Sequence, residues 1–392
     1  MERITIADAC TLHARIGWQG LTKAEYLDEG DYYLITGVDF NEGLIDFENC
    51  HFVSEDRYIQ DEHIQVAVND VLVTKDGTIG KVAIVDKLDK PATLNSGVFV
   101  VRPRNLDELL PEFLVVALRS GHFTRFIEQI KVGCTIAHLN QEKFLKYDIP
   151  RVSVEEQRYI VETLSKAEQA IKHRKQEIQL LDNLIKARFV ELFGDPTKYE
   201  VEPLNDNVEE MFIGPFGSAL KNEYFVDEDM SYCMVYEQKH AIQKTMDLPT
   251  RYVDESKYNE LKRFTVLGGD IIVSCRGTIG EIYSIPENAP MGIMHPSIMK
   301  IRLKKNKYCN LFFVMMLEQY MQDSMSKAKG SGVKMAVTAT ELGKEMFVVP
   351  NIEEQKAFEE FVKQIDKSKV AVQKALDETQ LLFDSLMQQY FG

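Results

Sequence analysis

Apolar residues recur at alternating intervals of four and three positions in two long stretches of this chain. The stretches run from Val154 to Phe193 and from Ile352 to Phe391, and neither contains glycine or proline, so residue propensity assigns both to helix. A seven-residue apolar period forms the seam of a coiled coil. The pattern therefore predicts two long helices that pair through the seam residues Ile160, Leu164, Ile171, Ile178, Ile185 and Leu192 in the first and Phe358, Val362, Ile365, Leu376, Phe383 and Leu386 in the second.

Three charged side chains interrupt the predicted seam. Arg174, Arg188 and Lys369 occupy seam positions, where a polar residue can fix the register of paired helices or can extend its charged end to solvent. Both interpretations stay open. So does the alternative that each helix lies on its own domain, which would produce the same pattern over two or three turns.

Shorter apolar runs precede each helix and predict two mixed α/β domains. Glycine-containing and polar turns separate the runs, which is typical of strands. Strands are expected at Val71 to Val73, Val98 to Val101, Ile271 to Val273 and Ile298 to Ile301, and a helix at Leu110 to Leu118. We expect an α+β fold with tandem domains at 1–150 and 195–350, each followed by a helical segment, at 151–194 and 351–392.

The two halves of the chain repeat one another. The segment Asp70 to Gly80 returns as Asp270 to Gly280, each copy ending in Gly-Thr-Ile-Gly, and the helix seams match at an offset of 198 residues. Such internal similarity indicates one structural unit used twice. Since each helix follows its own domain, antiparallel pairing of the helices would place the domains at opposite ends of a coiled coil, related by an approximate two-fold axis.

Composition agrees with two domain cores. The chain has 392 residues, 45% hydrophobic and 27% charged, and no apolar run reaches the roughly 20 residues of a membrane helix. Residues Met1 to Cys10 lack the features of a signal peptide, so we expect a cytoplasmic protein. The six cysteines are far apart and form no metal-ligand pair, so we expect buried free thiols.

Charge is negative overall but unevenly distributed. The net charge is −15; residues 31–70 contain ten acidic residues and one basic residue, whereas residues 300–334 contain eight basic residues and two acidic ones. The total disfavours unaided binding of nucleic acid, but a local basic face is sufficient to attract phosphate. We therefore expect such a face in the 300–334 segment, and acidic surface for a partner.

Motifs for independent catalysis are missing. An adenine methyltransferase would carry Asn-Pro-Pro or Asp-Pro-Pro, and no Pro-Pro occurs in the chain. Gly80 and Lys81 resemble the end of a phosphate-binding loop, but Lys75 occupies the position of its first glycine and no Ser or Thr follows Lys81. No two histidines have the spacing of a helical metal-ligand pair. We expect no catalytic residue and no metal site in this chain.

The repeated motifs together resemble the specificity (S) subunit of type I restriction-modification systems. The resemblance runs nearly end to end, although the first copy has Gly17-Trp18-Gln19-Gly20 where the second has Gly214-Pro215-Phe216-Gly217. It rests on Gly214 to Lys221, the Gly-Thr-Ile-Gly turns, Ile149-Pro150 followed by Glu155-Glu156-Gln157, and the helix that ends in Leu192-Phe193-Gly194.

The resemblance implies a non-catalytic subunit whose two target-recognition domains read double-stranded DNA. It also implies two adenine-N6 methyltransferase (M) subunits and restriction or motor (R) subunits as partners. S-adenosylmethionine, ATP and Mg²⁺ are then expected on those partners, with no cofactor bound by this chain.

We thus expect a subunit that recognises a bipartite DNA site and holds methyltransferase and restriction subunits on it. The helix from Ile160 to Leu192, about 48 Å long at 1.5 Å per residue, would be a spacer covering at most about 14 base pairs. The alternative is a protein-binding adaptor without direct DNA contact, which the acidic total favours.

The Gly-Thr-Ile-Gly turns allow two interpretations. Either they face DNA, with Arg276 suited to guanine and backbone amides suited to phosphate, or they are tight turns whose glycines serve only the fold. We favour the second, because domains that read different sequences would share a motif for structural reasons.

Specificity is instead expected where the copies differ. The differing segments are 18–23 against 216–221, and 131–138 against 327–334, the last as a basic, glycine-containing loop. A lone tryptophan such as Trp18 is more often a core residue, and isolated lysines more often form a solvated face. The candidate DNA-binding residues are Trp18, Lys23, Lys75, Lys131, Phe216, Lys221, Arg276, Lys327, Lys329 and Lys334.

Overall fold

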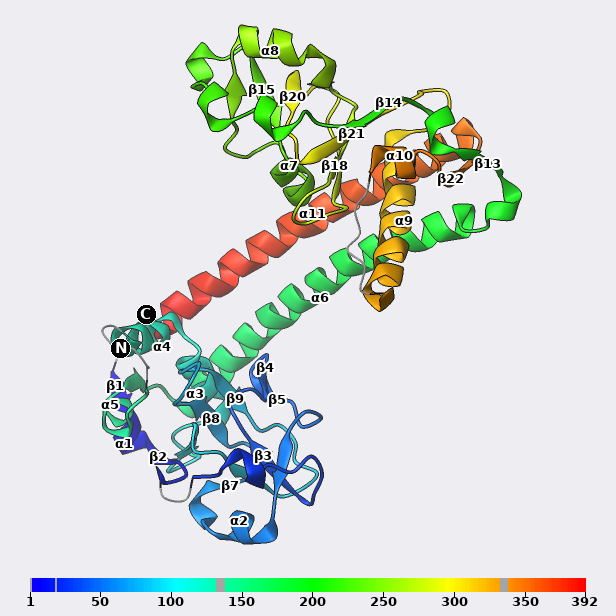
Figure 1. The fold of residues 1–392 in the computed structure, drawn as a ribbon. Helices are drawn as coiled ribbons and strands as arrows, with labels where there is room; N and C mark the ends of the chain where they lie inside the picture. Colours follow the sequence, from blue (N-terminus) through cyan, green and yellow to red (C-terminus); the bar gives the residue numbers. More distant parts are fainter. Residues whose placement is uncertain (1, 18–19, 132–137, 332–337) are drawn as a thin grey trace. The chain divides into compact units, whose positions relative to one another are not determined.

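Two compact units make up the computed structural model (Figure 1), which describes residues 2–17, 20–131, 138–331 and 338–392. The first unit contains the chain up to residue 177 together with residues 372–392, and the second contains residues 178–371. Each unit therefore holds one α/β domain, part of the long helix that follows it, and part of the other long helix. Within the described residues, no helix is long and apolar enough to cross a membrane.

The first domain contains a six-stranded sheet, a four-stranded sheet and a two-stranded ribbon. The six-stranded sheet has the order β2-β11-β8-β9-β5-β4, formed by Cys10–His13, Val98–Pro103, Val71–Thr74, Val82–Ile84, Leu44–Ile45 and Phe40–Asn41. The four-stranded sheet has the order β6-β3-β10-β7, formed by His51–Val53, Tyr32–Ile35, Ala92–Leu94 and Gln65–Val66. The ribbon pairs β1 (Arg3–Thr5) with β12 (Asp148–Pro150).

The second domain has the same plan with two four-stranded sheets and a ribbon. One sheet has the order β14-β21-β18-β19, formed by Val208–Ile213, Ile298–Leu303, Ile271–Ser274 and Ile282–Ser284. The other has the order β16-β15-β20-β17, formed by Tyr252–Val253, Cys233–Tyr236, Gly292–Met294 and Thr265–Val266. The ribbon pairs β13 (Glu200–Pro203) with β22 (Met346–Val349).

Helices complete each domain and mark where the two copies diverge. The first domain has α1 (Ile6–Ala9), α2 (Glu55–Ile59), α3 (Pro111–Leu118), α4 (Gly121–Lys131) and α5 (Gln141–Leu145). The second has α7 (Gln238–Gln243), α8 (Glu255–Leu261), α9 (Asn310–Ser331) and α10 (Ala339–Leu342). Strand β3 leads into the hairpin β4–β5, whereas the equivalent β15 leads into α7. The expected strands are present as β8, β11, β18 and β21, and the expected helix as α3, which confirms the mixed α/β class.

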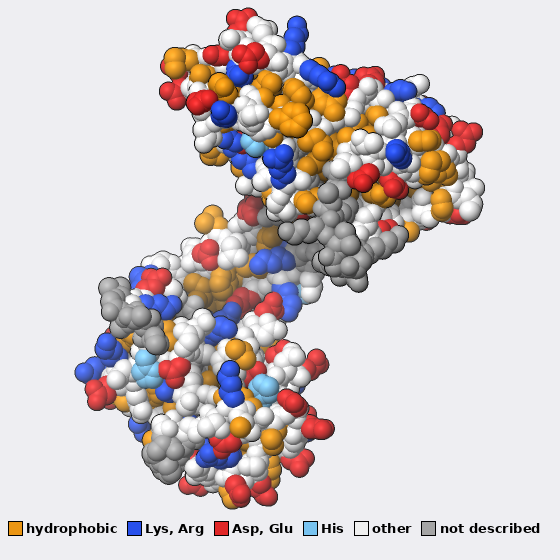
Figure 2. All heavy atoms as spheres, in the orientation of Figure 1, with side chains coloured by type: hydrophobic (Ala, Val, Ile, Leu, Met, Phe, Trp, Pro, Cys, Tyr) orange, Lys and Arg blue, Asp and Glu red, His pale blue; other side chains and the backbone are white. Residues whose placement is uncertain are grey.

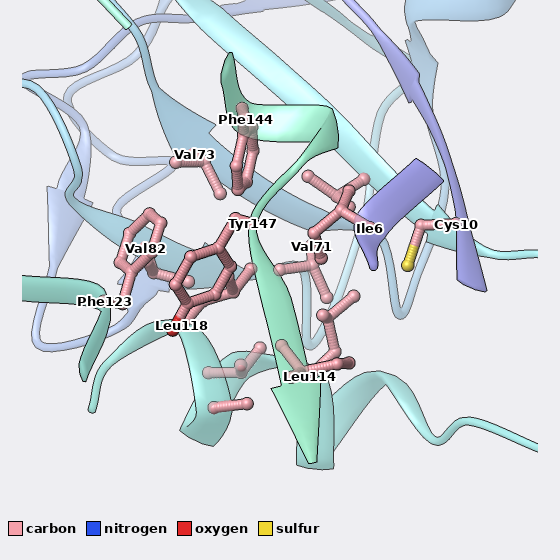
Figure 3. Packing of buried hydrophobic residues seen from close by; sticks show 14 of the residues in the cluster. Ile6, Cys10, Val71, Val73, Val82, Leu114, Leu118, Phe123, Phe144 and Tyr147 are labelled. Carbon is pink, nitrogen blue, oxygen red and sulfur yellow. The ribbon is translucent and has the colours of Figure 1, made fainter. Parts of the chain in front are cut away.

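Figure 3 shows the main core of the first unit. Val71 and Val73 from β8 lie with Leu114 from α3 and Phe144, which belongs to α5, and each of these side chains is at most 2% exposed. Burying one such side chain contributes about 1.5–3 kcal/mol. Cys10 joins the same cluster, where burial raises the pKa of its thiol to about 12 and so suppresses the reactive thiolate.

The cysteines agree in part with the expected buried thiols. All those that the structure describes are free; Cys10, Cys50 and Cys233 are buried, whereas Cys275 and Cys309 are half-buried. Cys134 lies outside the described residues.

The repeated Glu-Glu-Gln motif joins each long helix to its domain through the glutamine. Gln157 is 2% exposed; its Oε1 accepts the Leu110 N–H at 2.9 Å, and its Nε2 donates to the Glu108 carbonyl at 2.7 Å. Gln355 does the same in the second unit, accepting the Cys309 N–H at 2.9 Å. The motif therefore satisfies the free backbone amide that precedes α3 or α9.

The two long helices have the predicted bounds, α6 at Val154–Phe193 and α11 at Ile352–Phe391. In the second unit, the Phe189 ring lies 5.7 Å from that of Phe358, and Lys369 Nζ lies 2.6 Å from Asp182 Oδ1. The contacts move backward along α6 as they move forward along α11, so the helices are antiparallel. In the first unit, Ile160 from the start of α6 shares a core with the end of α11. The coiled-coil class is confirmed, and all twelve predicted pairing residues are buried or half-buried.

The charged seam residues differ in what they do. Lys369 binds Asp182 across the helix pair, which is the register-fixing interaction. Arg188 instead binds Glu191 on its own helix at 2.7 Å, with 41% of its side chain exposed, and so extends to solvent. Arg174 is half-buried, with one guanidinium nitrogen, Nη1, that has no hydrogen-bond partner among the described residues.

Candidate nucleic-acid interface

The two Gly-Thr-Ile-Gly segments form matching turns, between β8 and β9 and between β18 and β19. The Thr74 hydroxyl donates to the Thr78 carbonyl at 2.6 Å and accepts the Lys81 N–H at 2.9 Å. Ser274 makes the equivalent bonds, at 2.6 and 3.0 Å. Gly77 has φ +69° and Gly277 +67°, a backbone region that favours glycine. The shared motif therefore builds the same turn in both domains.

The two glycines of the first turn serve different purposes. At Gly77 an added Cβ would meet nothing within 4 Å, so only the positive φ requires glycine there. At Gly80, which also has a positive φ, an added Cβ would lie 2.8 Å from a side-chain carbon of Ile127 in α4. The second glycine thus allows α4 to pack against the turn, while the first lies at an exposed tip.

The tips of these turns present different side chains on the same backbone. Asp76 precedes Gly77 and is bonded by His138 Nδ1, and Lys75 Nζ lies 3.3 Å from its carboxylate. Arg276, at the equivalent position, is exposed and has no hydrogen bond or ion pair with any described residue. Lys75 was the predicted DNA-binding residue of the first turn, but Asp76 is the structural equivalent of Arg276.

A second equivalent turn follows the first strand of each parallel pair, β3–β10 and β15–β20. In the first domain the Thr36 N–H donates to the Asp39 carboxylate at 2.7 Å. In the second, the Glu237 N–H donates to His240 Nδ1 at 3.0 Å. Residues 36–39 and 237–240 are therefore equivalent; we call each the post-strand turn. The sequence carries no signal for this turn, because the two copies share no residue there.

Charged groups of the second post-strand turn are tightly coupled. Glu237 is 7% exposed, is hydrogen-bonded by Arg251, and has Lys239 Nζ 2.8 Å from its other oxygen. Burial alone would raise the pKa of Glu237, but these two cations hold it below the usual value. Burial lowers the pKa of His240, whose Nε2 has no hydrogen-bond partner among the described residues; Gln238 Oε1 is also unpartnered there.

In each domain a third loop lies next to the Gly-Thr-Ile-Gly turn. It connects β10 to β11 in the first domain and β20 to β21 in the second. The Lys75 N–H donates to the Gly97 carbonyl at 2.8 Å, and the Cys275 N–H to the Ser297 carbonyl at 2.8 Å. The first loop begins with Asn95 and the second with His295, whose pKa is lowered by burial. Each domain thus gathers three loops whose backbones match and whose side chains differ.

The other candidate residues lie in several places. Lys23 is exposed in the 3-10 turn Lys23–Glu25, Lys131 is exposed at the end of α4, and Phe216 is 88% exposed. Lys221 is exposed, with its Nζ 3.8 Å from a carboxylate oxygen of Glu223. Trp18 and Lys334 lie outside the described residues.

The expected basic, glycine-containing loop at 327–334 is partly wrong. Helix α9 continues to Ser331, so the backbones of Lys327, Lys329 and Gly330 are helical; the side chains of Lys327 and Lys329 are outside what the structure describes. Residues 310–329 contain no glycine or proline, and a single terminal glycine costs a helix only about 1 kcal/mol.

Of the eight basic residues at 300–334, three are held in ion pairs, whereas Lys305 is exposed and the side chains of Lys327, Lys329 and Lys334 lie outside what the structure describes. Lys300 on β21 is 1% exposed and binds Glu210 at 2.5 Å, Arg302 binds Asp270 at 2.7 Å, and Lys307 binds a carboxylate as well. Carboxylates brought close by the fold neutralise these three cations. A count of charges along the sequence cannot show such pairing. On the face drawn in Figure 2, basic and acidic side chains are interspersed over both units. Among the described residues, no group of three or more His, Cys, Asp or Glu side chains is arranged to hold a metal.

Comparison with known proteins decides the family. A model described as the type I restriction modification DNA specificity domain matches residues 2–182 and 219–379. The chain belongs to this family. The matched ranges include both Gly-Thr-Ile-Gly turns and most of both long helices. Relatives in this family are specificity subunits, so the chain is the non-catalytic specificity subunit of a type I restriction-modification system.

Individual relatives agree with the family assignment. The putative type I restriction enzyme MjaX specificity subunit of Methanocaldococcus jannaschii is 24% identical over 360 residues, which cover 88% of this chain and 83% of the relative. The S subunit of a type I restriction-modification system from M. genitalium has a similar structure, with a TM-score of 0.55 at 17% identity, covering all of this chain and 96% of that one.

A further solved structure supports the fold of this specificity subunit. It is described as the structural basis underlying complex assembly and conformational transition of the type I R-M system, and its chain matches with a TM-score of 0.65 at 16% identity, covering all of this chain and 97% of that one. At such identities the likeness concerns the fold alone.

Proposed function

We propose that this specificity subunit recognises a bipartite DNA site, with one half-site read by each domain. The difference between two otherwise matching turns carries the proposal: Asp76 stands where Arg276 stands, on the same backbone. An arginine guanidinium pairs with the two acceptors of guanine in the major groove, and an aspartate accepts from the amino group of cytosine. Two turns with the same backbone but with different side chains, Asp76 and Arg276, would therefore read different bases.

The exposed lysines are proposed as backbone contacts rather than readers. Lys23, Lys131 and Lys221 are exposed and can approach phosphates, which supply affinity and orientation but no sequence information. The aromatic ring of Phe216, at 88% exposure, has an area that a sugar or base could cover.

The subunit is further proposed to hold adenine-N6 methyltransferase and restriction subunits on the site, with α6 and α11 as the spacer between half-sites. The family assignment supports this, as does the net charge of −15, which provides acidic surface for protein partners. S-adenosylmethionine, ATP and Mg²⁺ are proposed to bind those partners.

Footprinting of the subunit co-purified with its methyltransferase tests the proposal. The expected result is two protected half-sites at a fixed separation, with adenine methylation in both. One continuous protected stretch, or no protection in the presence of the methyltransferase, would contradict it.

Replacing Arg276 tests whether the difference between Asp76 and Arg276 determines which bases are read. Arg276→Ala in the complex is expected to relax specificity at one base pair of one half-site by roughly 1–3 kcal/mol, leaving the other half-site unchanged. Lys305→Ala removes the same charge from an exposed side chain of the same domain and is the matched control. If Arg276→Ala and Lys305→Ala showed the same base specificity, Arg276 would not be a base-reading residue.

The adaptor function remains the second candidate, because the net charge favours it. It predicts that only the partner subunits contact DNA, so that they alone determine the DNA affinity of the complex. Under the DNA-reading proposal, Lys23→Ala, Lys131→Ala and Lys221→Ala together weaken binding on all sequences and flatten its salt dependence. Under the adaptor function, neither quantity changes.

A further inference from the structure

Val38 is an exposed apolar side chain that the fold does not use. It lies in the post-strand turn of the first domain and is 84% exposed. The turn is closed by other groups, since the Thr36 N–H and hydroxyl both bond to the Asp39 carboxylate, at 2.7 and 2.9 Å. Removing the Val38 side chain would leave these bonds in place.

The first post-strand turn lies against the turn tip that carries Asp76. A Cβ on Gly37 would be 2.9 Å from Cγ2 of Thr74, the residue at the end of β8. From the other side of the Gly-Thr-Ile-Gly turn, Lys81 Nζ reaches the Gly37 carbonyl at 3.4 Å. Val38 is therefore part of the same loop cluster as the proposed reading tip.

The third loop completes this surface with hydrogen-bonding groups. A Cβ on Gly97 would lie 3.6 Å from Cβ of Asp76, and the Ser96 hydroxyl bonds to Asn95. An apolar side chain thus stands among carboxylate, ammonium, hydroxyl and amide groups. A stable protein-docking face would bury about 800 Å² of total surface on each partner, whereas one valine among polar groups matches the edge of one base pair.

We infer that Val38 reads the C5-methyl group of a thymine in the half-site bound by the first domain. The methyl group is the one apolar feature of the major-groove edges, and apolar side chains recognise it by contact. In the second domain the equivalent position is Lys239, whose ammonium group pairs with Glu237, so the same turn would serve different bases. The inference rests on the proposed DNA-reading function and adds a specificity residue to it.

Single thymine-to-uracil substitutions test the inference, because uracil lacks only the methyl group. The complex of the full-length subunit with its methyltransferase is bound to duplexes carrying uracil at each thymine of the site in turn. Loss of one methyl contact is expected to weaken binding of the wild-type complex about fourfold at one position. Val38→Ala is expected to bind the thymine and uracil duplexes equally at that position.

The control is Val68→Ala, which shortens another exposed valine of the same domain, 49% exposed; it should keep the wild-type preference for thymine. The inference is overturned if no thymine responds, if the recognised half-site has none, or if Val38→Ala keeps the preference. If the wild-type complex showed no sequence-specific binding at all, the proposed function itself would be overturned. That result is seen with unmodified duplexes, so it can be told apart from failure of the Val38 inference, which appears only when thymine and uracil duplexes are compared.

Discussion

Arg102 binds Asp70 through two hydrogen bonds, from Nε to Oδ1 and from Nη2 to Oδ2, each 2.7 Å long. Arg302 and Asp270 form the same pair at the same distances in the second unit. Asp70 also accepts the Ala67 N–H at 2.8 Å. The aspartate that opens each repeated segment therefore ties β8 to β11, or β18 to β21, and holds the preceding turn.

Asp70→Asn is expected to lower the free energy of unfolding of the first unit by about 2–3 kcal/mol, because a buried carboxylate partner of Arg102 is lost. The loss stays below that of a fully buried pair, since Arg102 is 30% exposed and still donates to the Gln65 carbonyl. Hydrogen exchange of the β8 amides measures the effect within this unit. Asp86→Asn, at an exposed residue, should leave exchange unchanged; equal protection in both variants would refute the role of the pair.

Sequence alone predicted the features that depend on periodicity or on local turn chemistry. The bounds of α6 and α11 follow from an unbroken apolar period, and the tight turn at Gly77 follows from the repeated glycine motif. Two expectations failed for different reasons: the loop at 327–334 is helical as far as Ser331, and the pairing of the basic residues near 300 depends on contacts between distant strands. The burial of Lys300 becomes visible only when β21 lies beside β14, which carries Glu210.

The candidate surface was predicted less completely than the fold. The Gly-Thr-Ile-Gly tip was found because its residues repeat, whereas the post-strand turn around Val38 repeats only in geometry. Its equivalence to residues 237–240 appears once the parallel pairs β3–β10 and β15–β20 are aligned. Residues that differ between copies carry no sequence signal of their own, although they are where specificity is expected.

Alanine substitutions at the two glycines of the first turn are expected to lower the free energy of unfolding by different amounts. Gly77→Ala is expected to cost about 1 kcal/mol, because only its positive φ is unfavourable for alanine. Gly80→Ala adds contact with Ile127 and is expected to cost about 2–3 kcal/mol. Gly280→Ala is the matched control, because its nearest atom to an added Cβ is 3.7 Å away. Thermal unfolding of the three variants should rank Gly80→Ala lowest; an equal loss at Gly80 and Gly280 would refute the packing argument.

The Lys369–Asp182 pair predicts stability that is lost at high pH. Lys369 Nζ donates a hydrogen bond to the Asp182 carboxylate, and this bond raises the pKa of Lys369 above its ordinary value. A raised folded-state pKa means that the stabilisation is complete below the ordinary lysine value of about 10.4 and declines as pH rises through the folded-state value. The difference in unfolding free energy between wild type and Asp182→Asn should therefore be constant near neutral pH and shrink above about pH 10.4. A difference that stays constant as pH rises through the titration of Lys369 would contradict this assignment.

Shortening both long helices by one heptad tests whether they set the half-site separation. Removing residues 174–180 from α6 and 372–378 from α11 keeps the seam in phase and retains the Lys369–Asp182 pair. Each helix becomes about 10 Å shorter, so the preferred spacer between half-sites is expected to shorten by about three base pairs. Methylation of a library with randomised spacer lengths measures this directly. A control variant that keeps the seam residues but shuffles the exposed ones within the same heptads should retain the wild-type spacer, and an unchanged spacer in the shortened variant would show that the helices do not measure the site.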